Sequence, residues 1–246
     1  MAIVTPFIQE RLARLDASQA KWEVRIFKAL LKDFELVAAT YSLTGDAELA
    51  AAVLPQKHLI EALDALYQNI ILQEADYEYE YLIAREAKAI KPLASWLSSA
   101  RSFIMTRGAA SIRAITESTR KEIRRVLSTA LGEGSSIAAV TRTLRTQITD
   151  FSRLRATTIA RTELIGAANY GSLTGAISTG LNLQKEWLST TDSRTRVSHV
   201  LASGQQVPIN EMFIVGGERC EFPGDPILSA GERIRCRCTV VYVRTG

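Results

Sequence analysis

The first two-thirds of the chain repeat apolar residues at steps of three and four, the spacing of one face of an α-helix. One such series runs from Trp22 to Tyr41 and a second from Leu59 to Tyr81. This part of the chain is therefore predicted to be mostly helical. The 246 residues, 47% of them hydrophobic, are enough to form a core, as one large domain or two small ones.

Glycine and proline divide this helical pattern into segments. We expect the first helix to stop at Gly45, because glycine reaches left-handed backbone angles cheaply, and the next to begin after Pro55. Residues 76–82, DYEYEYL, alternate as a strand would, but their flanks keep helical spacing, so we interpret them as helix. Pro92 marks another break before a long helix.

A further break is predicted near residue 133. Gly132 and Gly134 suit the C-terminus of a helix, and Ser135 or Ser136 suits the N-cap of the next one. We expect Asp150 to cap one more helix, which runs to about residue 179. That helix contains three poor helix formers, Gly166, Gly171 and Gly175. They either let another backbone approach closely or break the helix.

The pattern changes to short segments after Gly180. We expect strands at 183–189, 211–215 and 233–244, a short helix at 194–202, a turn at 204–210 and a loop at 215–231. In the last strand, alternation would place Ile234, Cys236 and Cys238 on one face. The predicted fold class is α+β. A long, mostly helical region, residues 1–150, precedes a small C-terminal α+β domain, residues 151–246, with a short, mainly antiparallel sheet.

Four motifs follow one another in the C-terminal third of the chain. They are ARTELIGAANYG (160–171), KEWLSTTDSRTRVSHVLASGQQVPINEMF (185–213), FPGDP (222–226) and ERIRCRC (232–238). In this order they resemble the phage Mu protein F-like family of minor head proteins, over about residues 155–246. Members commonly carry Asn before the C-x-C pair, where this chain has Arg235.

This resemblance implies a role in building the heads of tailed phages. Such proteins look like low-copy structural components inside the capsid near the portal, which act in head morphogenesis and contact or accompany the packaged DNA. The implied partners are the phage portal protein, a scaffold or major capsid protein, and double-stranded DNA bound without sequence preference. The implied locations are the capsid interior of the virion and, during assembly, the host cytoplasm. Some larger family proteins carry a C-terminal toxin, which we do not expect here because the sequence ends at Gly246.

The cysteines lie near the C-terminus and suggest a metal site. Together with His199, Cys220, Cys236 and Cys238 offer one imidazole and three thiols, a ligand set that zinc favours. Their spacing is not that of a zinc finger. Three interpretations stay open: a structural zinc ion, buried free thiols, or a disulfide from Cys220 to one of the other two. We expect no other cofactor.

Several polar residues of the resemblance have a structural interpretation. They are Arg161, Glu163, Asn169, Asp192, Arg194 and Arg196. We expect Glu163 to accept hydrogen bonds from Arg194 or Arg196 and so to fix a helix against the sheet. The chain is therefore predicted not to be an enzyme.

The alternative is an enzyme carried by the C-terminal domain, either zinc-dependent or similar to ADP-ribosyltransferases. Arg161-Thr162-Glu163 faintly resembles elements of the latter, and a Cys–His pair with Asp192 has the residue types of a nucleophilic site. A pocket joining His199, Glu163 and Cys236 would favour an enzyme. A filled core there would favour the structural interpretation.

Basic residues concentrate in the middle of the chain. Residues 101–161 hold 12 Lys/Arg against 4 Asp/Glu, whereas residues 1–100 hold 10 against 14. This segment is either a solvated face that pairs with the acidic N-terminal part or a surface that meets DNA or an acidic partner. The candidate contact residues are Arg113, Arg120, Lys121, Arg124, Arg125, Arg142 and Arg145. Charge interrupts every apolar run too soon for a membrane span, so no membrane partner is expected.

Overall fold

The computed structural model describes residues 5–84, 90–133, 135–190 and 192–245. The helical part consists of α1 (Pro6–Thr44), α2 (Ala47–Ala52), α3 (Lys57–Ile83), α4 (Leu93–Phe103), the π-helical turn η1 (Ile104–Gly108), α5 (Ala109–Gly132) and α6 (Ile137–Ser178). The C-terminal part consists of β1 (Leu183–Leu188), α7 (Val197–Ala202), β2 (Gln206–Pro208), β3 (Phe213–Val215), β4 (Glu218–Cys220), α8 (Ala230–Arg233) and β5 (Thr239–Arg244). The predicted α+β class is confirmed.

Most helix ends follow from local chemistry. Gly45 closes α1 in the left-handed conformation, with φ of 65°. The Ser136 hydroxyl accepts a hydrogen bond from the Ala139 amide at 3.3 Å and caps α6, which decides between the two candidate serines. Residues 76–82 are helical, as expected. The predicted role of Gly134 lies outside the described residues.

Two boundary predictions are wrong. Helix α6 passes through Asp150 without a break, because Leu144 and Ile148 continue a buried stripe and Asp150 itself is exposed. The domain division predicted between residues 150 and 151 thus falls inside one continuous helix. The last strand begins at Thr239 instead of residue 233, because α8 and a left-handed Arg235, with φ of 59°, precede it.

The segments predicted as a turn and a loop also contain short strands. Residues 206–208 form β2 and residues 218–220 form β4. Strand β1 lies at the centre of a three-stranded antiparallel sheet in the order β2-β1-β5, while β3 and β4 form a separate antiparallel hairpin. The sheet is therefore antiparallel, as predicted, but it is built from shorter pieces.

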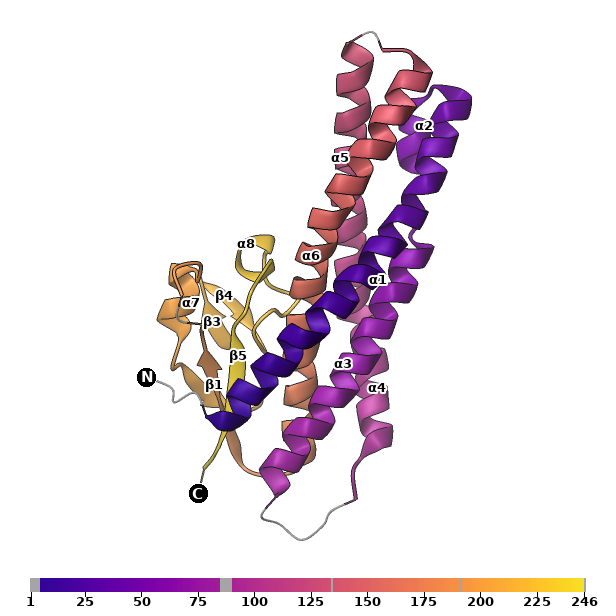
Figure 1. Ribbon diagram of the computed structural model, residues 1–246. Helices are drawn as coiled ribbons and strands as arrows, with labels where there is room; N and C mark the ends of the chain where they lie inside the picture. Colours follow the sequence, from indigo (N-terminus) through magenta and orange to yellow (C-terminus); the bar gives the residue numbers. More distant parts are fainter. Residues whose placement is uncertain (1–4, 85–89, 134, 191, 246) are drawn as a thin grey trace.

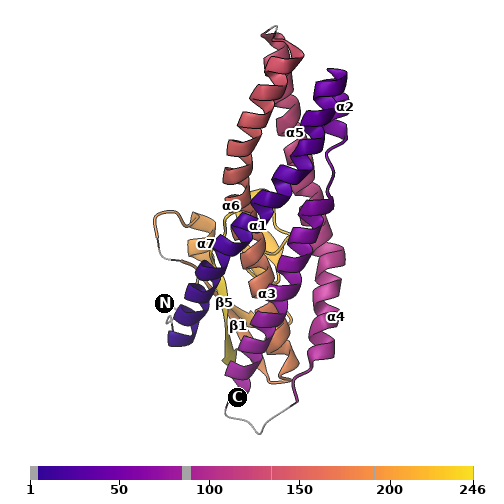
Figure 2. The same cartoon turned by 45° about the vertical axis from the view of Figure 1, so that its right-hand side comes forward.

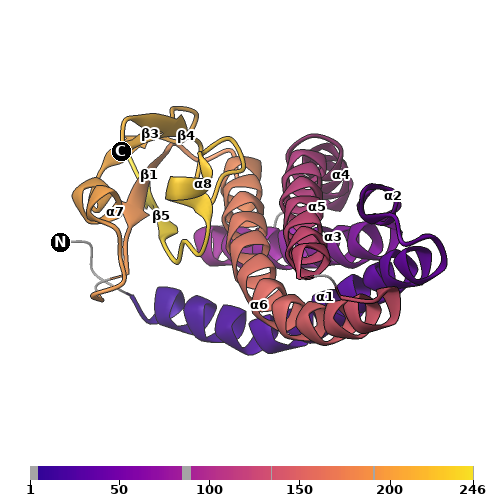
Figure 3. The ribbon, with the colours of Figure 1, turned by 90° about the horizontal axis from the view of Figure 1, so that it is seen from above.

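Helix α6 is the central element of the molecule. Helices α1 and α3 pack along it, and β5 contacts it from the C-terminal module. Viewed from above, α6 stands between that module on one side and α3, α4 and α5 on the other (Figure 3). Helix α1 crosses α6 obliquely, and its N-terminal end lies beside the module (Figure 1 and Figure 2). The C-terminal half of α6 thus belongs to both parts of the molecule.

The glycines inside α6 permit this close packing. A Cβ atom at Gly171 would lie 2.6 Å from the Ile71 carbonyl oxygen, and one at Gly175 would lie 2.2 Å from that of Ala75. Neither distance is compatible with a side chain, so α3 can cross α6 only where α6 has glycine. The helix does not break, and close approach is the correct interpretation of these residues.

The C-terminal module has its own buried aromatic core. The Trp187 ring on β1 is fully buried and lies 5.5 Å, centroid to centroid, from both Phe213 and His199. These edge-to-face contacts hold α7 over the sheet and so place His199. Within the described ranges, no helix combines the length and apolar character needed to cross a membrane.

Candidate functional site

A histidine and two cysteines meet inside the C-terminal module. The Nδ1 atom of His199 lies 3.2 Å from Cys238 Sγ and 3.7 Å from Cys236 Sγ. All three side chains are buried, and their candidate ligand atoms lie within 4.8 Å of one another. On the other edge of the ring, Nε2 is 3.0 Å from a carboxylate oxygen of Glu232. A histidine held by a carboxylate on its far side is the usual arrangement around metal ions.

The electrostatics of this cluster favour loss of a thiol proton. A hydrogen bond from Cys238, reinforced by His199, lowers the pKa of Cys236 to about 5. That same hydrogen bond, together with burial, raises the pKa of Cys238. Burial is the largest single effect on His199 and acts to lower its pKa, but the hydrogen bond and the charge interaction with Cys236, together with the charge of Glu232, leave the pKa raised. One thiolate beside an imidazole is a donor set that a cation can bind.

Cys220 does not belong to this cluster, so the predicted set of four ligands is wrong. It lies on β4, where burial, more than any other cause, raises the pKa of its thiol to about 12; the charges that act on it are those of Asp225, Lys185, Cys236 and Glu218. All three cysteines are buried and none forms a disulfide, so the disulfide alternative is not supported.

The convergence of Cys236 and Cys238 does not arise from strand alternation. Arg235 between α8 and Cys236 is the sole non-glycine residue with a positive φ in the described part of the chain, and the turn it makes directs the thiols to His199. Asparagine tolerates this left-handed conformation better than arginine does, which explains why an asparagine suits this position.

Asn169 is the hub that ties α6 to the C-terminal segments. Its side-chain amide donates to the carbonyl oxygens of Pro223 at 2.9 Å and Cys238 at 3.0 Å. Its side-chain oxygen accepts from Thr239 at 3.1 Å and from Arg11 at 3.3 Å. The amide therefore fixes both the PGDP loop and the cysteine loop against one point of the helix.

Sequence reasoning missed the partners of this hub on α1 and α3. Arg11 has no exposed surface and donates to Glu74 at 3.0 Å, to Thr239 at 3.0 Å and to the Ala168 carbonyl at 3.0 Å. Beside it, burial raises the pKa of Glu78 to about 7. The signal was present: Arg11 occupies a place in the buried stripe of α1, between Ile8 and Leu15, where an apolar residue would be expected.

Glu163 is a structural residue whose partner differs from the prediction. Its carboxylate accepts from Arg233 at 2.5 Å and from the Tyr67 hydroxyl at 2.9 Å. Arg233 also donates to Ser111 at 2.8 Å, so this contact joins α3, α5, α6 and α8. The expectation that Arg194 or Arg196 would pair with Glu163 is therefore wrong.

The remaining polar residues of the resemblance make peripheral contacts. Asp192 pairs with Arg237 and with Arg194, in a partly exposed group. Because of the Arg237 hydrogen bond first of all, the pKa of Asp192 is strongly lowered. Arg196 donates to the Ile234 carbonyl at 2.5 Å, and Arg161 donates to Gln19 on α1 at 3.0 Å. Within the described residues, no hydrogen bond or ion pair joins Asp192, Arg194, Arg196 or Arg161 to the His199 cluster, although the charge of Arg196 acts to lower the pKa of His199.

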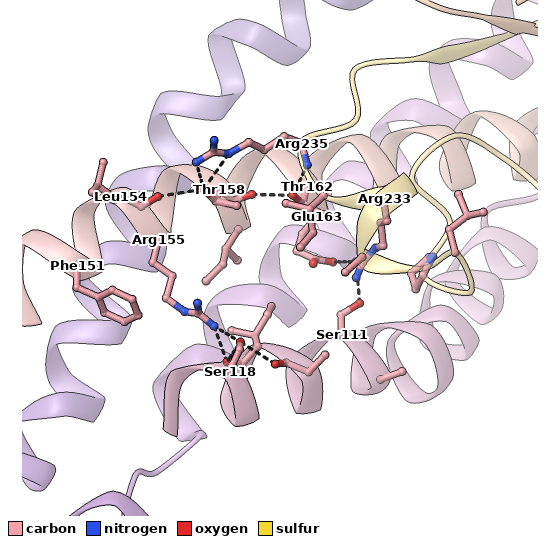
Figure 4. A pocket seen from close by; sticks show the side chains of 18 residues that line it. Ser111, Ser118, Phe151, Leu154, Arg155, Thr158, Thr162, Glu163, Arg233 and Arg235 are labelled. Carbon is pink, nitrogen blue, oxygen red and sulfur yellow. Dashed lines mark hydrogen bonds and ion pairs between the residues drawn. The ribbon is translucent and has the colours of Figure 1, made fainter. Parts of the chain in front are cut away.

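A pocket of about 500 Å³ opens between α5, α6 and the α8 segment. Glu163, Arg155, Arg233 and Arg235 contribute to its wall (Figure 4). Neither His199 nor the two clustered cysteines line it. Among the pockets formed by described residues, none joins Glu163 to the cluster, which is the arrangement that an enzyme was expected to show.

The basic residues fall into two groups in the structure. Arg120, Arg124 and Arg125 form ion pairs with Glu117, Glu48 and Glu122 respectively. The others, Arg113, Lys121, Arg142 and Arg145, are exposed and have no ion pair among the described residues. Only the second group is free to meet an external anion without first breaking a contact.

The hydrogen bonds of Asn169 predict how replacing its side-chain nitrogen by oxygen changes the stability of the protein. Asn169→Asp exchanges a donor for an acceptor opposite two carbonyl oxygens, so we expect it to lower the free energy of unfolding by about 3 kcal/mol or more. Asn182→Asp makes the same change where Asn182 donates to the Thr245 carbonyl in an exposed position, and should cost less than about 1 kcal/mol. Urea denaturation at pH 7 measures both; equal losses would contradict the role of Asn169.

Comparison with known proteins identifies the C-terminal half of the chain. Residues 121–241 match the family model described as Phage Mu protein F like protein. The chain is 34% identical over 121 residues to the NAD(+)–arginine ADP-ribosyltransferase EFV of Enterococcus faecalis, which covers 48% of this chain and 24% of that protein. It is 31% identical over 126 residues to the uncharacterized protein YqbB of Bacillus subtilis, covering 50% of this chain and 41% of YqbB.

The chain spans less than half the length of either relative. No solved structure matches significantly. The matched region contains α6, the His199 cluster and the Asn169 hub, and it ends within β5. The resemblance carried by the ARTE, PGDP and C-x-C motifs is therefore confirmed: residues 121–241 are a region of the phage Mu protein F-like family.

Proposed function

We propose that this protein is a minor head protein of a tailed phage. It is a low-copy structural component inside the capsid near the portal, and it acts in head morphogenesis beside the portal protein and a scaffold or major capsid protein. The observation that carries this proposal is the match of residues 121–241 to the Mu F-like family. The elongated helical part, with α1 and α3 along α6, offers an extended surface for such partners (Figure 1).

The interior of the module supports a structural role. Glu163 is engaged by Tyr67 and Arg233, and Asn169 by four partners, so their polar atoms hold elements together. A catalytic carboxylate would need access to a substrate and to the other reacting groups. The buried His199 cluster and the pocket beside Glu163 are separate.

The second candidate is an ADP-ribosyltransferase-like enzyme, which the similarity to the EFV protein favours. That similarity covers only 24% of EFV, and the geometry around Glu163 does not support it.

Mass spectrometry of purified virions tests the proposed function. We expect the protein in the virion at a few copies per portal, and we expect portal-free procapsids to lack it. Presence only in the infected-cell lysate would contradict the head role. Consumption of NAD⁺ by the purified protein that is abolished in Glu163→Gln, with the fold intact, would instead establish the enzyme.

Exposed cations on α5 and α6 support a contact with double-stranded DNA. Arg142 and Arg145 project from the first half of α6, and Arg113 and Lys121 lie on α5, all without an internal counter-ion among the described residues. Arginine and lysine at such positions bind phosphate with release of condensed cations. We infer that this part of the bundle meets the packaged genome without reading its sequence.

Fluorescence anisotropy with a labelled 20-bp duplex tests this contact. Binding should weaken steeply between 50 and 200 mM NaCl, and Arg142→Gln/Arg145→Gln should reduce the slope of log K against log salt by about two. The matched control Arg124→Gln/Arg125→Gln removes the same charge from ion-paired residues and should act less. Salt-independent binding, no binding at 50 mM, or equal effects of the two double variants would contradict the proposal.

We further propose that His199, Cys236 and Cys238 hold a structural zinc ion. The donor set fits zinc, because it offers one imidazole and two thiols around one point and a carboxylate, Glu232, behind the imidazole. The group of candidate ligands does not include Cys220, so the three residues leave the fourth position of a tetrahedral zinc site to another ligand. The ion would tie α7 to the loop before β5.

Elemental analysis of the purified protein checks the zinc proposal. We expect about one zinc per chain, lost in Cys236→Ser and in Cys238→Ser and retained in Cys220→Ser. Because Cys220 is equally buried, its variant controls for general loss of packing. Zinc-free protein with three titratable thiols after denaturation would favour buried free thiols, and loss of zinc in all three variants would restore Cys220 as a ligand.

A further inference from the structure

The pocket between α5, α6 and the α8 segment combines an apolar floor with unmatched positive charge. Ala114 and Ile115 of α5, Ile159 of α6 and Leu228 lie along the floor. The exposed side chain of Leu154, 72% accessible, stands on the wall. A volume of about 500 Å³ with an apolar lining and a few polar groups is typical of sites that bind a ligand.

The three arginines that line this pocket differ in whether a carboxylate pairs with their positive charge. The Arg233 guanidinium pairs with the Glu163 carboxylate at 2.5 Å. By contrast, Arg155 donates only to neutral groups, the Ile115 carbonyl at 2.7 Å and the Ser118 hydroxyl. The Arg235 side chain donates only to the Thr158 hydroxyl, at 2.8 Å from Nη2. The pocket is therefore lined by three arginines and one carboxylate, Glu163, and that carboxylate is already paired with Arg233 (Figure 4).

Arg155 is half-buried and forms no ion pair among the described residues. Its Nε atom is buried and has no hydrogen-bond partner among the described residues, and its guanidinium lies 5.4 Å from the Phe151 ring. The acidic residue that acts on its charge, Glu122, is bound to Arg125 at 2.6 Å. A desolvated charge without an opposite charge is unfavourable, and an anion entering the pocket would relieve it.

Arg235 reaches the pocket from a backbone conformation that arginine rarely adopts. Its φ of 59° is in the left-handed region, and its amide donates to Thr162 at 3.0 Å. The strained residue thus anchors its own backbone on α6 while its charged end lies over Thr158 (Figure 4). Strain of this kind is a reason to look for a function at the site.

We propose that this pocket binds a short segment of a partner protein in which apolar side chains flank a carboxylate. The apolar floor takes the aliphatic or aromatic side chains, and Arg155 and Arg235 take the carboxylate. Charge complementarity selects this occupant: a neutral apolar segment would leave both guanidiniums unmatched. A nucleic acid would bring phosphates but would cover the apolar floor poorly. The binding goes beyond the head role proposed above and can be tested without it.

The test uses pools of dye-labelled six-residue peptides. In one pool two positions are aspartate or glutamate and four are drawn from leucine, isoleucine, valine, phenylalanine and methionine. A second pool carries asparagine or glutamine in place of the acids, and a third carries lysine. After affinity selection on the full-length protein, we expect enrichment from the acidic pool alone, because only carboxylates match the guanidiniums.

Variants then locate the enriched peptide. Arg155→Gln and Arg235→Asn should each weaken its binding about tenfold, whereas Arg145→Gln, an equal charge loss at an exposed position on the same helix, should change it less than about twofold. Asparagine is chosen for residue 235 because it accepts the left-handed conformation. Circular dichroism melts confirm that the variants are folded, and Arg235→Asn, at an exposed position, gives a result even if Arg155→Gln unfolds.

Several results would overturn the proposal. They are no enrichment from the acidic pool, equal enrichment from the amide pool, and an equal loss in Arg145→Gln. If Arg155→Gln and Arg235→Asn weaken a 20-bp duplex but no peptide, the occupant is nucleic acid. If they abolish a dimer seen by sedimentation velocity, the occupant is a second copy of this chain.

Discussion

The fold depends on one buried cation, the Arg11 guanidinium. It has no exposed surface, and its partners come from three other elements: Glu74 on α3, Ala168 and Asn169 on α6, and Thr239 on β5. An unpaired guanidinium in this position would be unfavourable by several kcal/mol. An arrangement that buries Arg11 but lacks α3, α6 or β5 would therefore be destabilised, because Arg11 would lose the partners on that element. The helical part and the C-terminal module are therefore joined through their interior. One consequence is that α1, at the start of the chain, determines where β5, at its end, can lie.

Periodicity and breakers made much of the helical part predictable. The stripe from Trp22 to Tyr41 and the left-handed Gly45 act within one segment, where sequence spacing is a direct measure of geometry. The failures concern relations between segments. Asp150 has the chemistry of a cap, but Ile148 before it and Ala156 after it are both buried on the same helix, which continues through that position. The partner of Glu163 could not be chosen from sequence: Arg194 and Arg196 were expected, but packing brings Arg233 to it, a residue from a segment that sequence spacing does not place near α6. Arg11 stands at an apolar position of the helical spacing in α1. A charged residue is ordinarily assumed to be exposed, so this position was not recognised as buried.

Cys236 and Cys238 do lie on the same side of the chain, as predicted, although the predicted strand around them is wrong. Alternation on a strand and a left-handed turn at Arg235 both bring Cys236 and Cys238 to one side, since the residue between them faces the other way in either case. Only the turn, however, frees the backbone of residue 235 to bond to Thr162 on α6. The position of Cys220 depends on how the β3–β4 hairpin folds, which no spacing rule specifies.

The polar groups in and around the module differ in whether they find hydrogen-bond partners and opposite charges inside the protein. Around Asn169 and Glu163, donors and acceptors are matched at 2.5 to 3.3 Å across four or more elements, so these residues are committed to the fold. Arg155 lies about two turns of α6 before Glu163, and Arg235 bonds to Thr158 of the same helix, yet neither guanidinium forms an ion pair within the described chain. The structure thus holds one arginine in a complete set of internal partners and leaves two others beside an apolar pocket. The first arrangement fixes how the elements assemble, and the second is the basis of the proposed peptide site.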